Sequence, residues 1–432
     1  MTRTRHPVVL IHGVFGYGRK RPLWGAWAPY WPERALDAMQ ANYVVADVGV
    51  LSRYGYSYAT ALHPDWSEEN PVHLVGHSFG ATTAIELYQL ICADFFGVGS
   101  NHKWVKSIVS IAGPLSGTTL THLFGLHDGK MVRFTLGHAI GASLCLWQRL
   151  LTQFPVLRNI FDYRMPQWEF IDSYRESISS KCRVLASPDL AVYDILPARR
   201  LARNSQLQHM DKPFLISIVT STHSEFPTVE ISLGFSLLSV LSCLMFELSY
   251  HTSWAVALVM VFLLMMFFQR LKDLDYATLP CMTFLRVQMS WCVRWLHEIF
   301  DGFDRDQWEL NDGAVNITSM MFPMYLRTES PDSDGSEAEE ADTSDSDTGS
   351  TASTATSSSL PSSYVVSPPT QRLDLDAFTT HHTLKKHREH LVPGRWYVHT
   401  LKKNHLAGTH FDRHAPELFE RLLRLLDTEV EA

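Results

Sequence analysis

The 432-residue sequence contains few cysteines and no basic stripe. Its six cysteines include no C-x-x-C pair, which favours buried thiols over a disulfide framework or a cysteine metal site. The formal net charge of −8 arises in one segment. Residues 329–347 carry nine acidic side chains and no basic one, so the remainder is near +1 (−8 + 9). A chain with this charge balance and no RNA-binding motif gives no indication of nucleic acid as a partner.

The N-terminal residues also lack the apolar core of a secretory signal. Residues 1–6 run directly into an apolar, β-rich stretch, so we expect no signal peptide. The rest of the composition, 46% hydrophobic and 12% aromatic, is that of a globular protein. The length is sufficient for one large α/β domain or for two ordinary ones.

A strand–turn–helix pattern at residues 72–91 is the most informative stretch of the chain. The apolar run 72–75 predicts a buried strand, the sequence Gly-His-Ser-Phe-Gly follows at 76–80, and residues 81–91 predict a helix. This order is typical of a nucleophile elbow, in which glycines on both sides let neighbouring chains pack against a strained central residue. It predicts a nucleophilic Ser78. The alternative is an incidental surface serine in a tight glycine turn.

Further apolar runs predict more strands of the same sheet. They lie at 7–13, 42–51, 106–112, 214–220 and 396–401. Because these strands alternate with helical stretches, we expect a mostly parallel sheet with helices on both faces. The glycine-rich loop 12–18 has the spacing of neither a P-loop nor a dinucleotide fingerprint. We interpret it as an oxyanion loop, in which a backbone N–H points at a developing negative charge.

A serine nucleophile needs a histidine to take its proton and a carboxylate to fix the tautomer of that histidine. In hydrolases with an elbow these partners follow the serine in the order acid, histidine. The best-placed pair is Asp312, which Gly313 follows in a tight loop, and His405, just past the last predicted strand. His12 and His77 flank the site and are expected to hold loops by hydrogen bonds. Other candidates share a position near these loops: Asp301, Asp304, Asp306, His399, His410 and His414.

With these residues in place, the chain resembles the lipases of the staphylococcal and thermophilic-bacillus group, which are α/β-hydrolases. Residues 12–18 look like the group's HGFTGWG oxyanion loop, and residues 76–84 look like its AHSQGGQTA elbow. Residues 111–120 are similar to its IATPHDGTTL block, which opens the lid region. Further counterparts, including the blocks that carry the catalytic Asp and His, lie at 163–168, 187–194, 308–320 and 404–406. Together the blocks span most of residues 7–225 and 304–412, which is far more specific than one motif.

The resemblance implies an α/β-hydrolase fold and a serine lipase or esterase that cleaves acylglycerol-type esters through an acyl-enzyme. By position, Ser78 is the nucleophile, Asp312 the acid and His405 the base. The backbone N–H groups of Val14 and Phe79 would form the oxyanion hole, and no cofactor is required. Two alternatives share these residues: a membrane-tethered lipid acyltransferase that uses the same triad, and a non-catalytic hydrolase-fold protein that binds lipid or a partner.

The two metal sites of the group are only partly represented. The stretch 51–71, where the group has an insertion with zinc ligands, is short and offers few donors beyond His63 and Asp65, so zinc is not expected. In the calcium loop after the catalytic histidine, Ala407 stands where the group has a glutamate, although Asp412 matches. The resemblance therefore leaves calcium open and assigns no metal ligand.

We expect one hydrolase domain over residues 5–432, with three added segments. Residues 118–160 are amphipathic and helix-rich, which predicts a lid or ordinary core helices. Residues 231–300 are an apolar insertion without a counterpart in the group. It ends in an amphipathic helix, 281–300, suited to a membrane surface or to the core. Residues 329–369 are acidic and serine-rich, which predicts a disordered loop.

The first part of the insertion predicts an association with membranes. Residues 248–268 are about as long as the roughly 20 residues that cross a bilayer, and the basic stretch 269–272 follows. A membrane hairpin at 231–268 would make the protein integral to a membrane. A buried hairpin or an apolar cap lying on the bilayer are the alternatives. We therefore expect a lipid surface, presenting a lipid ester substrate, as the partner.

Overall fold

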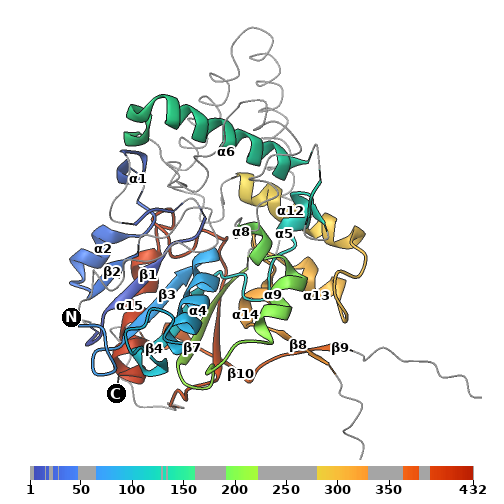
Figure 1. Cartoon of the computed structure of the whole chain (residues 1–432). Coiled ribbons are helices and arrows are strands. Elements are labelled where there is room, and N and C mark those ends of the chain that lie inside the picture. The colour runs from blue at the N-terminus through green and yellow to red at the C-terminus, as the bar shows by residue number, and fades with distance from the viewer. Residues whose placement is uncertain are drawn as a thin grey trace, which may run out of the picture.

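A seven-stranded parallel sheet is the framework of the chain (Figure 1). The structure is a computed structural model that describes residues 4–14, 16–18, 23–27, 29–46, 65–127, 130–132, 135–160, 191–221, 280–328, 363–378 and 390–431. The strand order is β10-β11-β7-β4-β3-β1-β2, and each neighbouring pair is parallel. The bounds are β1 (Val8–Ile11), β2 (Tyr43–Val45), β3 (Val72–His77), β4 (Val105–Ile111), β7 (Phe214–Thr220), β10 (Thr370–Arg372) and β11 (Trp396–Leu401).

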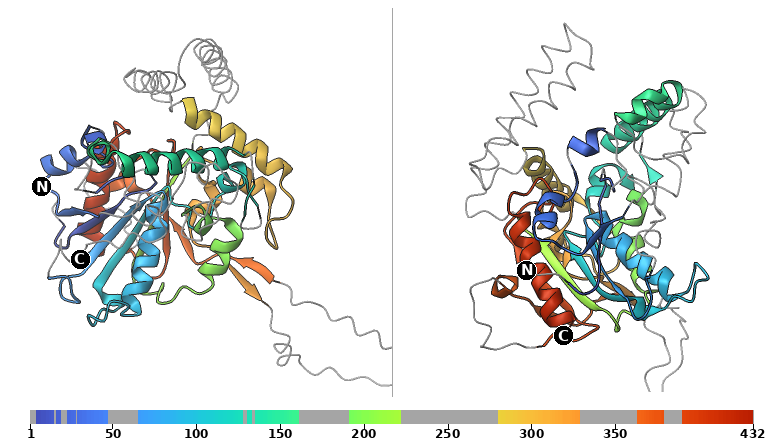
Figure 2. Two further views of the ribbon diagram at one scale, coloured as in Figure 1. Left: turned by 45° about the horizontal axis from the view of Figure 1, so that its top comes forward. Right: turned by 90° about the vertical axis from the view of Figure 1, so that its left-hand side faces the viewer.

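Helices cover both faces of this sheet because its strands alternate apolar side chains between the two faces. Val8 and Leu10 of β1 lie in one buried cluster with the apolar face of α15 (Ala415–Leu425). Val9 and Ile11 lie in a second cluster with the apolar face of α4 (Phe79–Cys92). The right-hand view of Figure 2 shows α15 and α4 on opposite sides of the sheet. The predicted parallel sheet with helices on both faces is therefore confirmed.

The remaining elements connect these layers or extend beyond them. The helices are α1 (Leu23–Trp27), α2 (Glu33–Ala38), α5 (Leu120–Leu123), α6 (Leu136–Gln153), α8 (Ala191–Asp194), α9 (Pro197–Asn204), α12 (Pro280–Trp295), α13 (Arg305–Glu309) and α14 (Ile317–Met321). The 3-10 turns are η1 (His102–Trp104), η2 (Pro155–Asn159) and η4 (Leu375–Phe378), and a π-helical turn, η5 (Leu426–Val430), follows α15. Two antiparallel pairs are β5 (Leu126–His127) with β6 (Lys130–Met131), and β8 (Tyr325–Thr328) with β9 (Ser363–Val366).

The segment predicted as a lid, residues 118–160, contains α5, the β5–β6 hairpin, α6 and η2. In all views α6 and α12 lie at one end of the molecule, beyond the sheet (Figures 1 and 2). The arrangement is that of a layer over one end of the framework. A lid function for it stays a prediction.

The predicted disordered loop, 329–369, includes at its C-terminal end residues that form a strand. Residues 363–366 form β9, which pairs with β8, and β10 begins at Thr370. The reason is local, because the sequence Tyr-Val-Val at 364–366 favours a strand and Val365 packs against the buried cluster that contains Trp308. Residues 329–362 lie outside the described residues.

The amphipathic helix predicted at 281–300 corresponds to α12, which ends at Trp295 rather than at Phe300. The chain leaves the helix there because Leu296 and Phe300 pack with Trp308 in one buried cluster. The predicted membrane hairpin at 231–268 lies outside the described residues. None of the helices within the described ranges is long and apolar enough to cross a bilayer.

Candidate active site

Ser78 occupies the turn between β3 and α4, as the elbow pattern predicts. Its backbone has φ 54° and ψ −129°, a left-handed conformation that is strained for a residue with a side chain. The backbone N–H of Ser78 donates to the Ile111 carbonyl of β4 at 2.8 Å, which fixes the turn against the sheet. A Cβ atom on Gly80 would lie 2.1 Å from the Ile11 carbonyl oxygen, so only glycine allows β1 to approach this closely.

The structure brings Ser78, His405 and Asp312 into one hydrogen-bonded chain. The Oγ of Ser78 lies 2.7 Å from Nε2 of His405, and Nδ1 of His405 lies 2.9 Å from Oδ2 of Asp312. These residues follow β3, β11 and α13 respectively. The His405 and Asp312 side chains are buried, and Ser78 is partly accessible. This is the geometry in which a histidine can take a proton from a serine while a carboxylate fixes its tautomer.

The carboxylate of Asp312 is held by four donors. Oδ2 accepts from His405 and from the Thr220 hydroxyl at 2.5 Å, and Oδ1 accepts from the backbone N–H groups of Ala314 and Val315 at 3.0 and 2.8 Å. Burial alone would raise the pKa of Asp312. The adjacent His405 charge and these hydrogen bonds outweigh burial, and the pKa lies below its usual value. Asp312 is therefore ionised at neutral pH.

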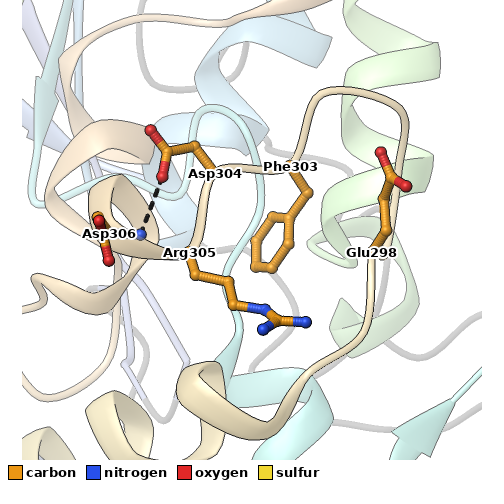
Figure 3. A pocket seen from close by; sticks show the side chains of 5 residues that line it. All are labelled: Glu298, Phe303, Asp304, Arg305 and Asp306. Carbon is orange, nitrogen blue, oxygen red and sulfur yellow. Dashed lines mark hydrogen bonds between the residues drawn. The ribbon is translucent and has the colours of Figure 1, made fainter.

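The competing acids and histidines have other partners. Asp304 is the N-cap of α13 and accepts from the backbone N–H of Asp306 at 3.0 Å, as Figure 3 shows. These two residues line an open pocket of about 410 Å³ with Glu298, Phe303 and Arg305, and its lining does not include Ser78, Asp312 or His405. Nδ1 of His399 lies 3.2 Å from both the Leu375 N–H and the Leu373 carbonyl oxygen. His410 and His414 lie on the surface side of the loop after His405.

The loop after β1 lies directly beside the elbow. A Cβ atom on Gly13 would be 2.8 Å from the Cβ of Ser78, which shows how closely the two backbones approach. Val14 packs against a buried cluster formed by Phe79, Ala191 and Ile195. The two residues predicted to supply the oxyanion hole therefore belong to one packed group next to Ser78. Their role as donors stays a prediction.

α12 packs on the Asp312 loop, which the sequence did not indicate. The side-chain amide of Asn311 donates to the Arg286 carbonyl and to the Ser290 hydroxyl at 3.2 and 3.1 Å. The same hydroxyl donates to the Glu309 carbonyl at 3.0 Å. The insertion that ends in α12 is thus connected to the acid of the hydrogen-bonded chain.

The residues that match the calcium loop of the resembling group do not fit a calcium ion. Nζ of Lys403 lies 2.6 Å from Oδ1 of Asp412, and this carboxylate also accepts from the backbone N–H groups of His414 and Gly408 at 3.0 and 3.1 Å. A lysine ammonium therefore occupies the place next to Asp412, and the buried Ala407 offers no side-chain oxygen where the group has a glutamate. Within the described ranges, no group of three or more His, Cys, Asp or Glu side chains is arranged to hold a metal ion.

We expect the stability of the His405 loop to depend on Lys403 and not on calcium. Replacing Lys403 with alanine leaves the largely buried Asp412 carboxylate without its cation and should lower the unfolding temperature. EDTA or added calcium should leave the unfolding temperature of the wild type unchanged, whereas a resident ion would add about 2.7 kcal/mol at a hundredfold excess over Kd. The exposed neighbour Lys402 provides the control substitution. Destabilisation of the wild type by EDTA would contradict this interpretation.

The parallel sheet, the strained serine turn and the loops at the carboxyl ends of the strands define the α/β-hydrolase fold. No protein-family model matches the chain. Three solved structures are similar over nearly the whole chain. EstA from Clostridium botulinum has 17% identity and a TM-score of 0.55, covering 98% of this chain and 87% of that one. Staphylococcus hyicus lipase has 15% identity and a TM-score of 0.55, covering 99% of this chain and 96% of that one.

Lipase 1 from Pelosinus fermentans is the third, with 19% identity, a TM-score of 0.52, and coverage of 98% of this chain and 99% of that one. At these identities the similarity shows the fold. The resemblance to the staphylococcal lipases inferred from the sequence blocks is confirmed at that level, since one of these lipases is among the structural neighbours.

Proposed function

We propose that the protein is a serine ester hydrolase that acts on acylglycerol-type lipids. The observation that carries the proposal is the hydrogen-bonded chain from Ser78 through His405 to Asp312, located in an elbow beside the loop after β1. The similarity in fold to bacterial lipases and an esterase supports the same reaction class. The class rests on the side chains of the site, because a fold alone does not determine a reaction.

In the proposed reaction, Ser78 Oγ attacks the ester carbonyl while His405 Nε2 takes its proton. The carbonyl oxygen becomes an oxyanion, which the N–H groups of Val14 and Phe79 stabilise by roughly a few kcal/mol per donor. His405 then gives the proton to the departing alcohol, and an acyl ester of Ser78 remains. Water repeats the sequence and releases the fatty acid. Asp312 holds the histidine tautomer with Nε2 free to accept and stabilises the imidazolium.

Exposed apolar side chains on the layer of α6 and α12 support a water-insoluble substrate. Trp291 and Trp295 of α12 are 59% and 72% exposed, one helical turn apart, with ring centroids 6.2 Å from each other. Phe154 and Val156, after α6, are 57% and 74% exposed. Large apolar side chains at this exposure favour an interface with lipid, where tryptophan is a preferred residue. We propose that this layer contacts the lipid surface that presents the ester.

Covalent labelling tests the proposal directly. A fluorophosphonate probe should label the wild type, and peptide mapping should find the adduct on Ser78. Ser78→Ala should lose both labelling and fatty acid release from a tributyrin or triolein emulsion, while it keeps the wild-type circular dichroism spectrum. Ser110→Ala is the control, because its buried hydroxyl lies on the neighbouring strand β4. Labelling of another serine, or full activity in Ser78→Ala, would exclude the proposed nucleophile.

Accumulation of a new ester in the presence of an alcohol, with little free acid, would indicate an acyltransferase instead.

A further inference from the structure

Two residues beside the hydrogen-bonded chain have no part in the proposed chemistry. His77 ends β3 immediately before Ser78 and is 1% exposed. Its Nδ1 lies 2.6 Å from the hydroxyl of Tyr30, and its Nε2 lies 2.7 Å from the backbone carbonyl oxygen of His405. The His77 and His405 rings approach to 5.2 Å between centroids without a direct side-chain hydrogen bond. His77 therefore contacts the backbone of His405 and leaves its ring free for Ser78.

These distances determine where the protons are. A carbonyl oxygen can only accept, so Nε2 of His77 carries the hydrogen and donates to His405. Nδ1 is then unprotonated and accepts from the Tyr30 hydroxyl. Burial and the adjacent His405 charge lower the pKa of His77 to about 3, which keeps it neutral across the physiological range. Burial raises the pKa of Tyr30, and a hydrogen bond from the Gly13 backbone partly offsets the rise, so Tyr30 is neutral as well.

Through Tyr30 this pair reaches the loop after β1, the elbow and the histidine loop, which hold the proposed catalytic groups other than Asp312. The Tyr30 hydroxyl lies directly against Gly13, the residue before the proposed oxyanion donor Val14: a Cβ atom on Gly13 would be 2.6 Å from the hydroxyl oxygen. The Tyr30 backbone carbonyl accepts from the N–H of His410 at 2.8 Å, in the loop that follows His405. His77 is bonded covalently to Ser78. One neutral network thus ties the loop after β1, the elbow and the histidine loop to one another.

We infer that Tyr30 and His77 are positioning residues that hold the His405 imidazole and the Gly13–Val14 backbone in register with Ser78. This inference rests on the proposed function. The pair acts through the backbones of His405 and Gly13 and touches none of the reacting atoms. A neutral His77 also suits the reaction, because a positive charge 5.2 Å from His405 would oppose formation of its imidazolium. Loss of the network should therefore lower kcat more than it changes KM.

The experiment compares two tyrosine-to-phenylalanine substitutions. Tyr30→Phe removes only the hydroxyl and should lower kcat on a soluble p-nitrophenyl ester by about 10- to 100-fold, with KM within about twofold, since small displacements at a reacting centre have effects of that size. Tyr88→Phe is the matched control. Tyr88 lies on α4, and its buried hydroxyl donates to the His209 carbonyl at 2.8 Å. The Tyr88→Phe variant therefore loses a comparable hydrogen bond and should keep the wild-type kcat. The kcat of each variant is measured at the same interval below that variant's own unfolding temperature.

Substitutions at His77 provide the second arm. In His77→Gln the side-chain amide can donate to the His405 carbonyl and accept from Tyr30, so this variant should retain more activity than His77→Leu. Equal losses of kcat in Tyr30→Phe and Tyr88→Phe, or a change in KM alone, would overturn the inference. So would equal activity in the glutamine and leucine variants.

A measurement without turnover separates this inference from the proposed function. The proton on His405 Nδ1, shared with Asp312, should give a low-field proton resonance. Tyr30→Phe should shift or broaden it, and Tyr88→Phe should leave it unchanged. If the wild type neither hydrolyses esters nor reacts with the fluorophosphonate probe, the proposed function fails, while the resonance still decides whether Tyr30 positions His405. An unchanged resonance in Tyr30→Phe would contradict the positioning role even in an active enzyme.

Discussion

Replacing Asp312 with asparagine should lower kcat for ester hydrolysis by about 10⁴-fold, the effect of the equivalent change in a serine protease triad. The reason lies in the proton on His405. The ionised carboxylate requires an N–H at Nδ1 and so leaves Nε2 free to accept from Ser78. An asparagine amide can donate to Nδ1, which stabilises the other tautomer and places a hydrogen on the nitrogen that must act as the base. It also carries no charge to stabilise the imidazolium.

The measurement is kcat on a soluble p-nitrophenyl ester, together with the rate of fluorophosphonate labelling, which should fall in parallel. Asp94→Asn is the matched control, because Oδ1 of Asp94 also accepts from two backbone N–H groups, those of Val98 and Ser100, at 3.0 and 2.9 Å. Asp94 lies on the surface after α4, and its substitution should leave kcat unchanged. A decrease below about tenfold in Asp312→Asn would mean that another group fixes the tautomer of His405.

The residues of the hydrogen-bonded chain could be located from the sequence because each lies in a short loop with a local signature. Ser78 lies between two glycines after an apolar strand, Asp312 precedes a glycine, and His405 follows the last long strand. Nothing comparable marks Thr220 and Tyr30. Their hydrogen bonds to Asp312 and His77 join residues 92 and 47 positions apart, so only the folded chain brings them together.

α12 illustrates a different limit. Its amphipathic pattern predicted a helix with one apolar face, and the helix is present. Periodicity does not identify what a face packs against, and the contact between α12 and the Asp312 loop depends on single side chains such as Asn311. The strand at 363–366 was missed because the acidic composition before it dominated the segment, whereas pairing with β8 decides its structure.

Replacing Gly80 with alanine should strongly destabilise the elbow. The added Cβ would lie 2.1 Å from the Ile11 carbonyl oxygen and 2.7 Å from that of His12, and both obstacles are backbone. Neither can rotate away as a side chain does, so β1 and the start of α4 must separate. Overpacking of a rigid site costs about 1–3 kcal/mol and at times more, and we expect the upper end of this range because the strand lies inside the sheet.

The effect should reach the chemistry as well as the fold, because His12 leads into the loop that carries Val14. We therefore expect Gly80→Ala to lower both the denaturant midpoint of unfolding and the kcat of the protein that remains folded. Gly97→Ala is the control: its φ is +65°, so alanine there is strained by about 1–2 kcal/mol, but a Cβ would meet nothing within 4 Å. It should lower stability modestly and leave kcat intact. If both variants unfold at the same denaturant concentration with wild-type kcat, the close approach of β1 to the elbow does not position the oxyanion loop. A selective loss in Gly80→Ala would instead show that the spacing between strand and elbow is part of the active-site geometry.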